Sequence, residues 1–358
     1  MNRVMILSNS RPGSGFGRYS QSLYESTNGY SDLFNILPSD NYDDKNTSGI
    51  PVSGTLTKFR KFNSAVKPLT AMERIATPIL FSKFKKTVRE HKKEEGIVHY
   101  SYEYVPFIDF SYDNIVTIHD LIVLNKNYEF KRLDRFYSEL MIRHYLKFGI
   151  IIAPSNEVKR QIIELGSEAS VEVIHHPVSK TFYTIKEKKE LRKQLGLPLD
   201  KKLVLSISNT APWKNLKRVR EAVSFLGPDY QLVRVGARIG ESITFTNVDG
   251  STLNKIYNAC DLLLFPSLEE GFGFPIIEAF TVGLPVVASE IPVLEEVSGR
   301  AAILIQPDNI SSIVSGIKEA MNNVNSLTEK GYSLARNYTL EAFSKKMYNF
   351  YSWAPTKL

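Results

Sequence analysis

Two glutamates, Glu270 and Glu278, flank a glycine-rich stretch that offers the most specific chemistry in this sequence. The stretch follows the apolar run Leu262–Phe265 and contains Gly271 and Gly273, which allow a ligand to approach the backbone closely. It leads into a helical pattern, and the free amides at a helix start attract anions. Carboxylates accept hydrogen bonds from the vicinal hydroxyls of a ribose or a hexose. The pattern predicts that both glutamates line one cleft, and a helix cap plus a surface glutamate is the plain alternative.

A lysine, Lys214, holds a second candidate position, after the apolar run Leu203–Ile207 and a turn. Asn215 is expected to cap the helix that follows. A lysine at a helix start adds a full positive charge to the partial charge of the helix dipole, which suits a diphosphate. A solvated surface lysine is the alternative.

A histidine–aspartate pair, His119 and Asp120, lies at the end of the apolar run that starts at Ile115. Ligands of parallel sheets bind beyond such strand ends. The pair is therefore placed to contact sugar hydroxyls or to position a reacting group. The alternative is a histidine that is satisfied at a strand end, with Asp120 capping the next turn.

A glycine loop, Gly13-Ser14-Gly15-Phe16-Gly17, follows the first apolar run, Val4–Leu7. Glycines next to the start of a helix can hold a phosphate. The spacing differs from the dinucleotide-binding pattern, which argues against a nicotinamide oxidoreductase. A plain tight turn between strand and helix would also explain the loop.

The elements that must position these residues alternate between strands and helices, which predicts parallel sheets covered by helices on both faces. Two halves show the same rhythm, so we expect an α/β fold with two Rossmann-like, doubly wound domains. The predicted domains are residues 1–178, residues 179–337 and a C-terminal helix in 338–358 whose apolar face needs a groove. The other expected strands are 97–100, 150–153, 232–235 and 286–288, and the expected helices lie at about 133–148, after Asn215, at about 310–321 and at about 340–353.

Length and composition indicate a globular protein of more than one domain. The chain has 358 residues, of which 43% are hydrophobic and 23% charged. Its apolar runs are too short to cross a membrane, and its N-terminus lacks the pattern of a signal peptide. A single cysteine, Cys260, excludes an internal disulfide and a multi-cysteine zinc site. We therefore expect a cytoplasmic protein in a reducing compartment.

Positive charge is concentrated in residues 58–93, which contain eleven Lys and Arg against two Glu, whereas the net charge of the whole chain is only +7. This distribution argues against a general nucleic-acid-binding protein and for a local anionic partner. Apolar residues are interleaved, with Phe81, Phe84 and Val88 at helical spacing. We expect this segment to contact either an anionic acceptor or the inner face of an anionic membrane. A solvated basic face is the alternative. Residues 39–68 read as a long loop.

In their order along the chain, these motifs resemble the retaining glycosyltransferases of glycosyltransferase family 4, which have the two-domain GT-B fold. The resemblance extends over nearly the whole chain and is most specific from Glu270 to Glu278. The other matching pieces are the glycine loop, Thr117–Leu121, Pro154–Asn156, Lys214-Asn215, Leu253–Asp261 and Gly283–Ser289.

The resemblance implies a role for each candidate residue. Glu278 would bind the ribose of a nucleotide, Glu270 would hold the donor sugar, and Lys214 would bind the diphosphate. His119 would lie near the hydroxymethyl end of the sugar and the reacting centre. Backbone groups would complete the site, with Gly15 and Phe16 at the diphosphate, Val248 at the base, and Gly271, Phe272, Gly273 and Phe274 at the sugar.

The sequence departs from the family at one point. Many members place an arginine five or six residues before the lysine, and here those positions are Asn209 and Ser208. The positive charge at the leaving group is then reduced unless another residue, such as Arg18, supplies it. The family also implies no cofactor and no metal ion, and no Asp-x-Asp motif is present to hold a metal.

The resemblance implies an enzyme that moves a hexose from a UDP- or GDP-sugar to a glycan or lipid-linked acceptor with retention of the anomeric configuration. It implies front-face attack, in which the departing phosphate helps to take the proton of the acceptor. Two alternatives share the same two-domain shell: a nucleotide-sugar epimerase or hydrolase, and a non-catalytic subunit that binds nucleotide sugars. The sugar, the base and the acceptor remain open.

Overall fold

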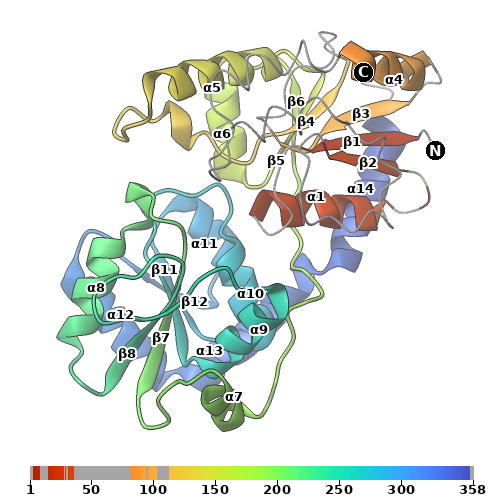
Figure 1. Ribbon diagram of the computed structural model, residues 1–358. Helices are drawn as coiled ribbons and strands as arrows, with labels where there is room; N and C mark the ends of the chain where they lie inside the picture. The colour runs from red at the N-terminus through yellow and green to blue at the C-terminus, as the bar shows by residue number, and fades with distance from the viewer. Residues whose placement is uncertain are drawn as a thin grey trace, which may run out of the picture. The chain divides into compact units, whose positions relative to one another are not determined.

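The computed structural model describes residues 3–8, 15–27, 29, 31–35, 82–93, 96–102 and 113–354. The chain divides into two compact units: unit 1 contains residues 1–175 and 343–358, and unit 2 contains residues 176–342. Each unit is built on one six-stranded sheet with helices packed on it (Figure 1). Within the described ranges, we find no helix with the length and apolar character needed to span a membrane.

The sheet of unit 1 has the strand order β2-β1-β3-β4-β5-β6, and neighbouring strands are parallel. The order reverses between β1 and β3, which is where doubly wound sheets bind ligands. The strands are β1 (Val4–Ser8), β2 (Ser31–Asn35), β3 (Ile97–Tyr100), β4 (Ile115–Thr117), β5 (Ile150–Ala153) and β6 (Ser170–Val173). The helices before the second unit are α1 (Gly15–Ser26), α4 (Ser82–Lys93), α5 (Arg132–Tyr145) and α6 (Asn156–Glu164).

The C-terminal helix α14 (Leu340–Trp353) returns to unit 1 from Phe343 onward. Its apolar side is buried there, as the sequence pattern predicted, at Phe343, Met347, Phe350 and Tyr351. Polar contacts fix the docking as well, since the Ser344 hydroxyl donates to the carbonyl of Ser26 over 2.8 Å.

The sheet of unit 2 has the strand order β12-β11-β10-β7-β8-β9, again with parallel neighbours. The order reverses between β7 and β10. The strands are β7 (Lys202–Ile207), β8 (Tyr230–Val235), β9 (Ile243–Phe245), β10 (Leu262–Phe265), β11 (Val286–Ser289) and β12 (Ala302–Ile305). The helices are α7 (Lys188–Gln194), α8 (Leu216–Phe225), α9 (Gly250–Ala259), α10 (Phe274–Val282), α11 (Pro292–Ser298), α12 (Ile310–Asn322) and α13 (Val324–Ala335).

Both faces of this sheet are buried, which explains why its central strands are mostly apolar. In β7, Leu203 and Leu205 pack in a core with Ile277 of α10. The intervening Val204 packs on the other face with Val219 of α8 and Ile313 of α12. Period-two alternation therefore separates two cores rather than a core from solvent.

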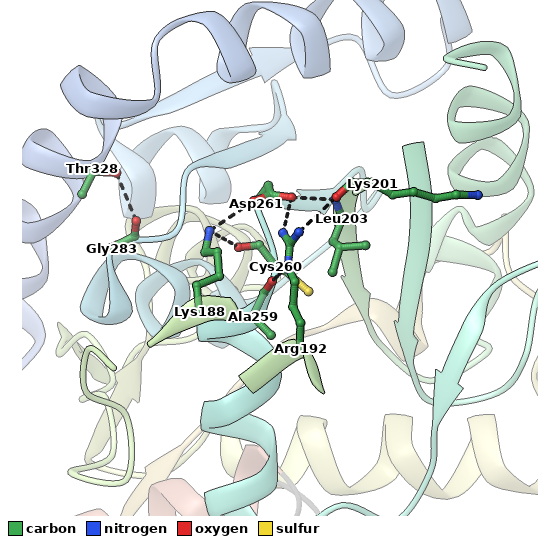
Figure 2. A network of polar contacts seen from close by, with 9 residues as sticks. All are labelled: Lys188, Arg192, Lys201, Leu203, Ala259, Cys260, Asp261, Gly283 and Thr328. Atoms are coloured by element: carbon green, nitrogen blue, oxygen red, sulfur yellow. Dashed lines mark hydrogen bonds and ion pairs between the residues drawn. The ribbon is translucent and has the colours of Figure 1, made fainter. Parts of the chain in front are cut away.

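The segment of unit 2 that precedes its sheet is anchored by Asp261, which directly precedes β10 (Figure 2). The Asp261 carboxylate accepts a hydrogen bond from Arg192 over 2.7 Å, one from the backbone amide of Leu203 over 2.7 Å, and one from Lys188 over 3.2 Å. Helix α7 is thereby held at the N-terminal edge of the sheet, opposite the edge at which the loops of interest begin.

The basic segment is described only in part. Residues 39–81 lie outside the described ranges, so the expected loop and the first half of the basic segment stay predictions. The second half contains helix α4, in which Val88 is fully buried in the core of unit 1. Val88 therefore packs inside the protein, and the prediction that it belongs to a membrane-facing apolar stripe was wrong.

Candidate functional site

Two loops of unit 2 begin at the C-terminal ends of β7 and β10, the adjacent strands between which the sheet order reverses. Polar contacts join the two loops. The backbone amide of Leu268 donates to the carbonyl of Trp213 over 2.7 Å. The Asn215 side-chain amide donates to the carbonyl of Pro266 over 3.1 Å. The loops therefore form one connected surface at the position where open α/β sheets bind ligands.

Lys214 and Glu270, two of the predicted site residues, meet in an ion pair on this surface. The Lys214 Nζ lies 2.5 Å from Glu270 Oε1, and the side chains are 16% and 10% exposed. The ammonium also lies 5.8 Å from the centre of the Phe265 ring. Because so little water reaches the pair, each charge depends on the other, and removing one partner leaves the second uncompensated.

Asn215 does not cap helix α8 with its side chain, so that prediction was wrong. Its backbone is left-handed, with φ of 56°, a conformation that asparagine tolerates. Its side-chain amide instead donates to the carbonyls of Pro266 and Pro307, and its side-chain oxygen accepts from Arg218. The residue bridges three loops and so fixes the position of Lys214 beside it.

The glycine-rich loop ends at Gly273, which requires glycine for two reasons. Its φ of 102° is rarely adopted by other residues, and a Cβ there would lie 2.9 Å from Leu294 Cδ2. Gly273 is also the N-cap of α10 and provides no side-chain hydrogen bond to the first amides. The first backbone amides of α10 therefore have no hydrogen-bond acceptor in the side chain of the N-cap residue.

Glu278 lies in α10 and is 3% exposed. Its Oε2 accepts a hydrogen bond from the Tyr257 hydroxyl of α9 over 2.6 Å. Tyr257 is itself fully buried against Phe182, with the rings edge to face. The sequence reasoning gave Tyr257 no role, although it lies in the matching piece Leu253–Asp261. The tyrosine orients one oxygen of the carboxylate.

Arg234 in β8 is the other residue that the sequence reasoning missed. It is fully buried, and its guanidinium donates to the carbonyls of Ser206 and Val235 over 2.9 and 2.7 Å. It also donates to the carbonyl and the hydroxyl of Ser208 over 2.5 and 3.0 Å. Gly236 makes room, because a Cβ there would lie 3.0 Å from the guanidinium.

The Arg234 cation is held by neutral oxygens. Its hydrogen bonds and ion pairs within the described ranges include no carboxylate, and burial lowers its pKa to about 10. It therefore stays positive at neutral pH. It contacts Ser208, one of the two positions where the resembling family carries an arginine. A basic residue inside an otherwise apolar strand, Leu232-Val233-Arg234-Val235, was the sequence signal that could have identified it.

Phe272 and Val248 have packing roles in unit 2. Phe272 is buried and contacts the rings of His176, Phe274 and Tyr338. Val248 is half-buried after β9 and packs against the same core. The predicted backbone contacts of these two residues with a ligand stay predictions.

His119 of unit 1 follows β4 and is 3% exposed. Its Nε2 lies 2.9 Å from the carbonyl of Ser101, which can only accept, so Nε2 carries the proton. Burial lowers the pKa of His119 to about 4, so the imidazole is neutral at pH 7 and Nδ1 is an acceptor. The ring of Tyr19 packs edge to face against it, with centroids 4.9 Å apart. The Asp120 carboxylate accepts a hydrogen bond from the backbone amide of Ile122. Asp120 therefore caps the turn, which was the alternative interpretation.

A chain of buried hydrogen bonds runs from Tyr19, which packs against His119, to helix α14. The Tyr19 hydroxyl hydrogen-bonds with Thr117 Oγ1 over 2.9 Å, and Thr117 Oγ1 with His99 Nε2 over 2.8 Å. His99 Nδ1 then contacts the Tyr351 hydroxyl of α14. Burial lowers the pKa of His99 to about 3, so this imidazole is neutral as well.

The predicted phosphate-binding loop of unit 1 is described only from Gly15. Gly15 and Phe16 are the first two residues of α1, so the helix begins within the stretch that was predicted as a loop, and Arg18 lies in the same turn. Gly13 and Ser14 are outside the described ranges. The structure therefore places the helix start but says nothing of the preceding loop.

Comparison with known proteins finds a family match within unit 2. Residues 187–334 match the family described as glycosyl transferases group 1. The O-antigen chain mannosyltransferase RfbU of Salmonella typhimurium is 30% identical over 216 residues, which are 57% of this chain and 59% of that protein. The serotype-specific mannosyltransferase WbdA of Escherichia coli is 26% identical over 284 residues, 70% of this chain and 33% of that protein. The matched regions thus span less than two thirds of the length of these relatives.

Solved structures match over nearly the whole chain. A sucrose-phosphate synthase from Thermosynechococcus elongatus has a TM-score of 0.77 at 18% identity and covers 98% of both chains. Anabaena HepE, solved with UDP and glucose, has a TM-score of 0.74 at 16% identity and covers 98% of this chain and 100% of its own. WaaG, a glycosyltransferase involved in lipopolysaccharide biosynthesis, has a TM-score of 0.70 at 16% identity, with 97% and 99% covered. At such identities the likeness concerns the fold, and it confirms the predicted class of two Rossmann-like domains of the GT-B type.

Proposed function

We propose that this protein is a retaining hexosyltransferase that moves a hexose from a nucleotide-diphosphate sugar to a glycan or lipid-linked acceptor. The observation that carries the proposal is the Lys214–Glu270 pair on the joined loops at the reversal point of the unit 2 sheet. The match of residues 187–334 to glycosyl transferases group 1 supports it, because that range contains both loops.

The donor would be held by unit 2. The Glu278 carboxylate, oriented by Tyr257, would accept hydrogen bonds from the ribose hydroxyls. The backbone after Asn247, at Val248, would meet the base. Glu270 and the amides of residues 271–274 would hold the hexose. We infer that Glu270 keeps Lys214 in place before the donor arrives.

The departing nucleoside diphosphate concentrates negative charge on its β-phosphate. Lys214 would stabilise that charge directly in a preorganised site. Arg234 would add a second, buried positive charge beneath the loop that carries Ser208, and so partly replace the missing surface arginine. The amides at the starts of α10 and α1 would contribute their partial positive charge.

Retention would follow from attack on the face of the sugar that the phosphate leaves. The acceptor hydroxyl would lose its proton to the departing phosphate, so neither a protein nucleophile nor a metal ion is required in this proposal. His119 would accept a hydrogen bond from the hydroxymethyl group at Nδ1, because Nε2 donates to Ser101. The enzyme would act in the cytoplasm on acceptors at the inner face of the membrane.

The test is a transfer assay on the purified protein with a panel of UDP- and GDP-sugars and of glycan and lipid-linked acceptors, read by mass spectrometry. The product's anomeric configuration is then read by proton NMR. Transfer with retention that requires Lys214 supports the proposal. Release of free sugar or isomerised donor without transfer would instead indicate the hydrolase or epimerase alternative, and binding without any turnover would indicate a silent subunit.

A further inference from the structure

The orientation of the His119 ring depends on side chains to which the proposed reaction gives no role. The hydrogen bond from Nε2 to the carbonyl of Ser101 fixes one atom of the imidazole. The plane of the ring is set by the aromatic rings that pack on it. Tyr19 of α1 lies edge to face with it, at an interplanar angle of 85°, and Tyr102, after β3, lies tilted at 57°. A shift of Tyr19 would therefore let the imidazole turn and would move its second nitrogen, Nδ1.

Tyr19 is held in place by helix α14 through a direct ring contact. The ring of Phe343 lies edge-on to the ring of Tyr19, with centroids 6.0 Å apart and an interplanar angle of 71°. Both residues are buried, Tyr19 at 0% and Phe343 at 2% exposed. The next residue of α14, Ser344, donates its hydrogen bond to Ser26, the last residue of α1. Helix α14 thus braces the helix that carries Tyr19 (Figure 1).

The chain of buried hydrogen bonds gives α14 a second route to Tyr19, from Tyr351 through His99 and Thr117. Its four members come from four elements: α14, β3, β4 and α1. Each of the four residues is at most 1% exposed, so little water is present to replace a broken bond. A neutral imidazole has one donor and one acceptor nitrogen, which suits His99 as a link between two hydroxyls. Burial raises the pKa of the Tyr19 phenol, so this link stays protonated as well.

This chain does more than attach α14 to unit 1. Apolar side chains at the same places would dock the helix without the cost of burying polar groups. Hydrogen bonds are directional, however, and a connected chain of them allows one arrangement of its members. Thr117 also precedes His119 by two positions. The chain therefore fixes both the backbone that leads to His119 and the ring that packs on it.

We propose that Tyr19 is a positioning residue for His119, and that Phe343 and Tyr351 of α14 determine where Tyr19 lies. The proposal rests on the proposed function, because it assumes that His119 binds the donor hexose. In this proposal α14 acts on the reaction through the orientation of His119 rather than through a contact of its own with the donor. The last helix of the chain is then required for catalysis as well as for the fold.

The first experiment is a double-mutant cycle in the transfer assay, with the donor and acceptor that the panel identifies. Y19F keeps the ring but breaks the hydrogen-bond chain, and should lower kcat about tenfold, a coupling within the range that residues in contact show. In the H119A background the same change should cost about twofold or less, because the residue that Tyr19 positions is already gone. T117V should behave like Y19F, and T117S, which keeps the hydroxyl, should recover most of kcat.

The second measurement needs no substrate. NMR of the full chain, labelled at histidine, follows the imidazole signals of His119, which are assigned by their absence in H119A. Y351F should shift these signals, because the loss of its hydroxyl breaks the chain at α14. Y145F and Y348F are the matched controls and should leave the signals unchanged. Tyr145 is as buried in unit 1 as Tyr351, and Tyr348 lies on α14 itself but is 56% exposed. Thermal unfolding checks that every variant is folded at the assay temperature.

Three results would overturn the proposal. The first is a Y19F variant that lowers kcat by the same factor with and without His119, because the chain would then have a structural role alone. The others are a Y351F variant with unchanged His119 signals, and a T117S variant as slow as T117V. A folded protein that transfers no sugar from any donor would count against the proposed function. The NMR result would still decide whether α14 orients His119.

Discussion

Replacement of Glu278 by glutamine tests the ribose assignment most directly. Glutamine keeps the length of the side chain and still accepts the hydrogen bond from Tyr257, which is 2.6 Å long in the wild type. The fold should therefore be preserved, whereas the negative charge offered to the ribose is lost. Alanine would instead leave a cavity and an unpaired tyrosine hydroxyl, and would mix stability with binding.

The expected magnitude follows from burial and charge. Glu278 is 3% exposed, so little water competes for its oxygens. A hydrogen bond to a charged acceptor contributes about 1.5–3 kcal/mol. At about 1.4 kcal/mol per factor of ten, E278Q should weaken nucleoside diphosphate binding about tenfold to a hundredfold. The variant Y257F should have a smaller effect, because it removes the orienting group and leaves the carboxylate.

The assay is calorimetry with UDP and GDP, each compared with its 2′,3′-dideoxy form. The wild type should lose affinity when the hydroxyls are removed, and E278Q should hardly distinguish the two ligands, because its loss has already occurred. E295Q, which removes an exposed carboxylate from α11, is the matched control and should behave as wild type. Glu278 does not bind the ribose if E278Q binds the ribonucleotide as tightly as wild type does. The same conclusion follows if E278Q loses as much affinity as wild type does when the ribose hydroxyls are removed.

Three further predictions concern turnover and stability. K214A should fold and lower kcat by about two orders of magnitude at saturating donor, because the diphosphate loses its direct cation; unchanged kcat would reject the role. R234M should lower both kcat and the urea midpoint, since the carbonyl of Ser208 loses its donor, and R234K should recover part of kcat; equal kcat in both variants would leave Arg234 a purely structural role. Acid should destabilise unit 1, because the unfolded chain protonates His99 and His119 below about pH 6.5 whereas the folded chain, with pKa values of about 3 and 4, does not. Thermal or urea unfolding between pH 7 and 5 should show a loss of up to about 1.4 kcal/mol per pH unit for each histidine, and H119Q should halve the slope.

The central strands of both sheets could be predicted from sequence, and the edge strands could not. The eight predicted strands are the four inner ones of each sheet, at β1, β3, β4 and β5 and at β7, β8, β10 and β11. Inner strands are covered on both faces and so appear as continuous apolar runs. The edge strands β2, β6 and β9 include polar residues, as in Ser31–Asn35, and β12 is only partly buried. Their positions depend on pairing with a neighbour, which a single-sequence pattern does not record.

The candidate site, like the sheets, could be predicted only where the signal is local in the sequence. Glycines, paired carboxylates and a lysine at a helix start are local signals, and they led to Glu270, Glu278 and Lys214. That Lys214 pairs with Glu270 depends on the adjacency of β7 and β10, which the order of elements alone does not reveal. Arg234 and Tyr257 act on residues 26 and 21 positions away in the chain, so their partners were invisible to any short motif.

The return of α14 to unit 1 has a consequence for how the chain is made. Unit 2 is one continuous stretch, residues 176–342, inserted into a unit whose two pieces lie on either side of it. During synthesis unit 2 can form as soon as its own stretch has left the ribosome. Unit 1 cannot be completed until α14 has been made, because Tyr351 of α14 contacts His99, which lies 252 positions earlier in the sequence. The earlier-translated unit is thus the later one to be completed, and until then its buried histidines and the groove for α14 remain open to water and to chaperones.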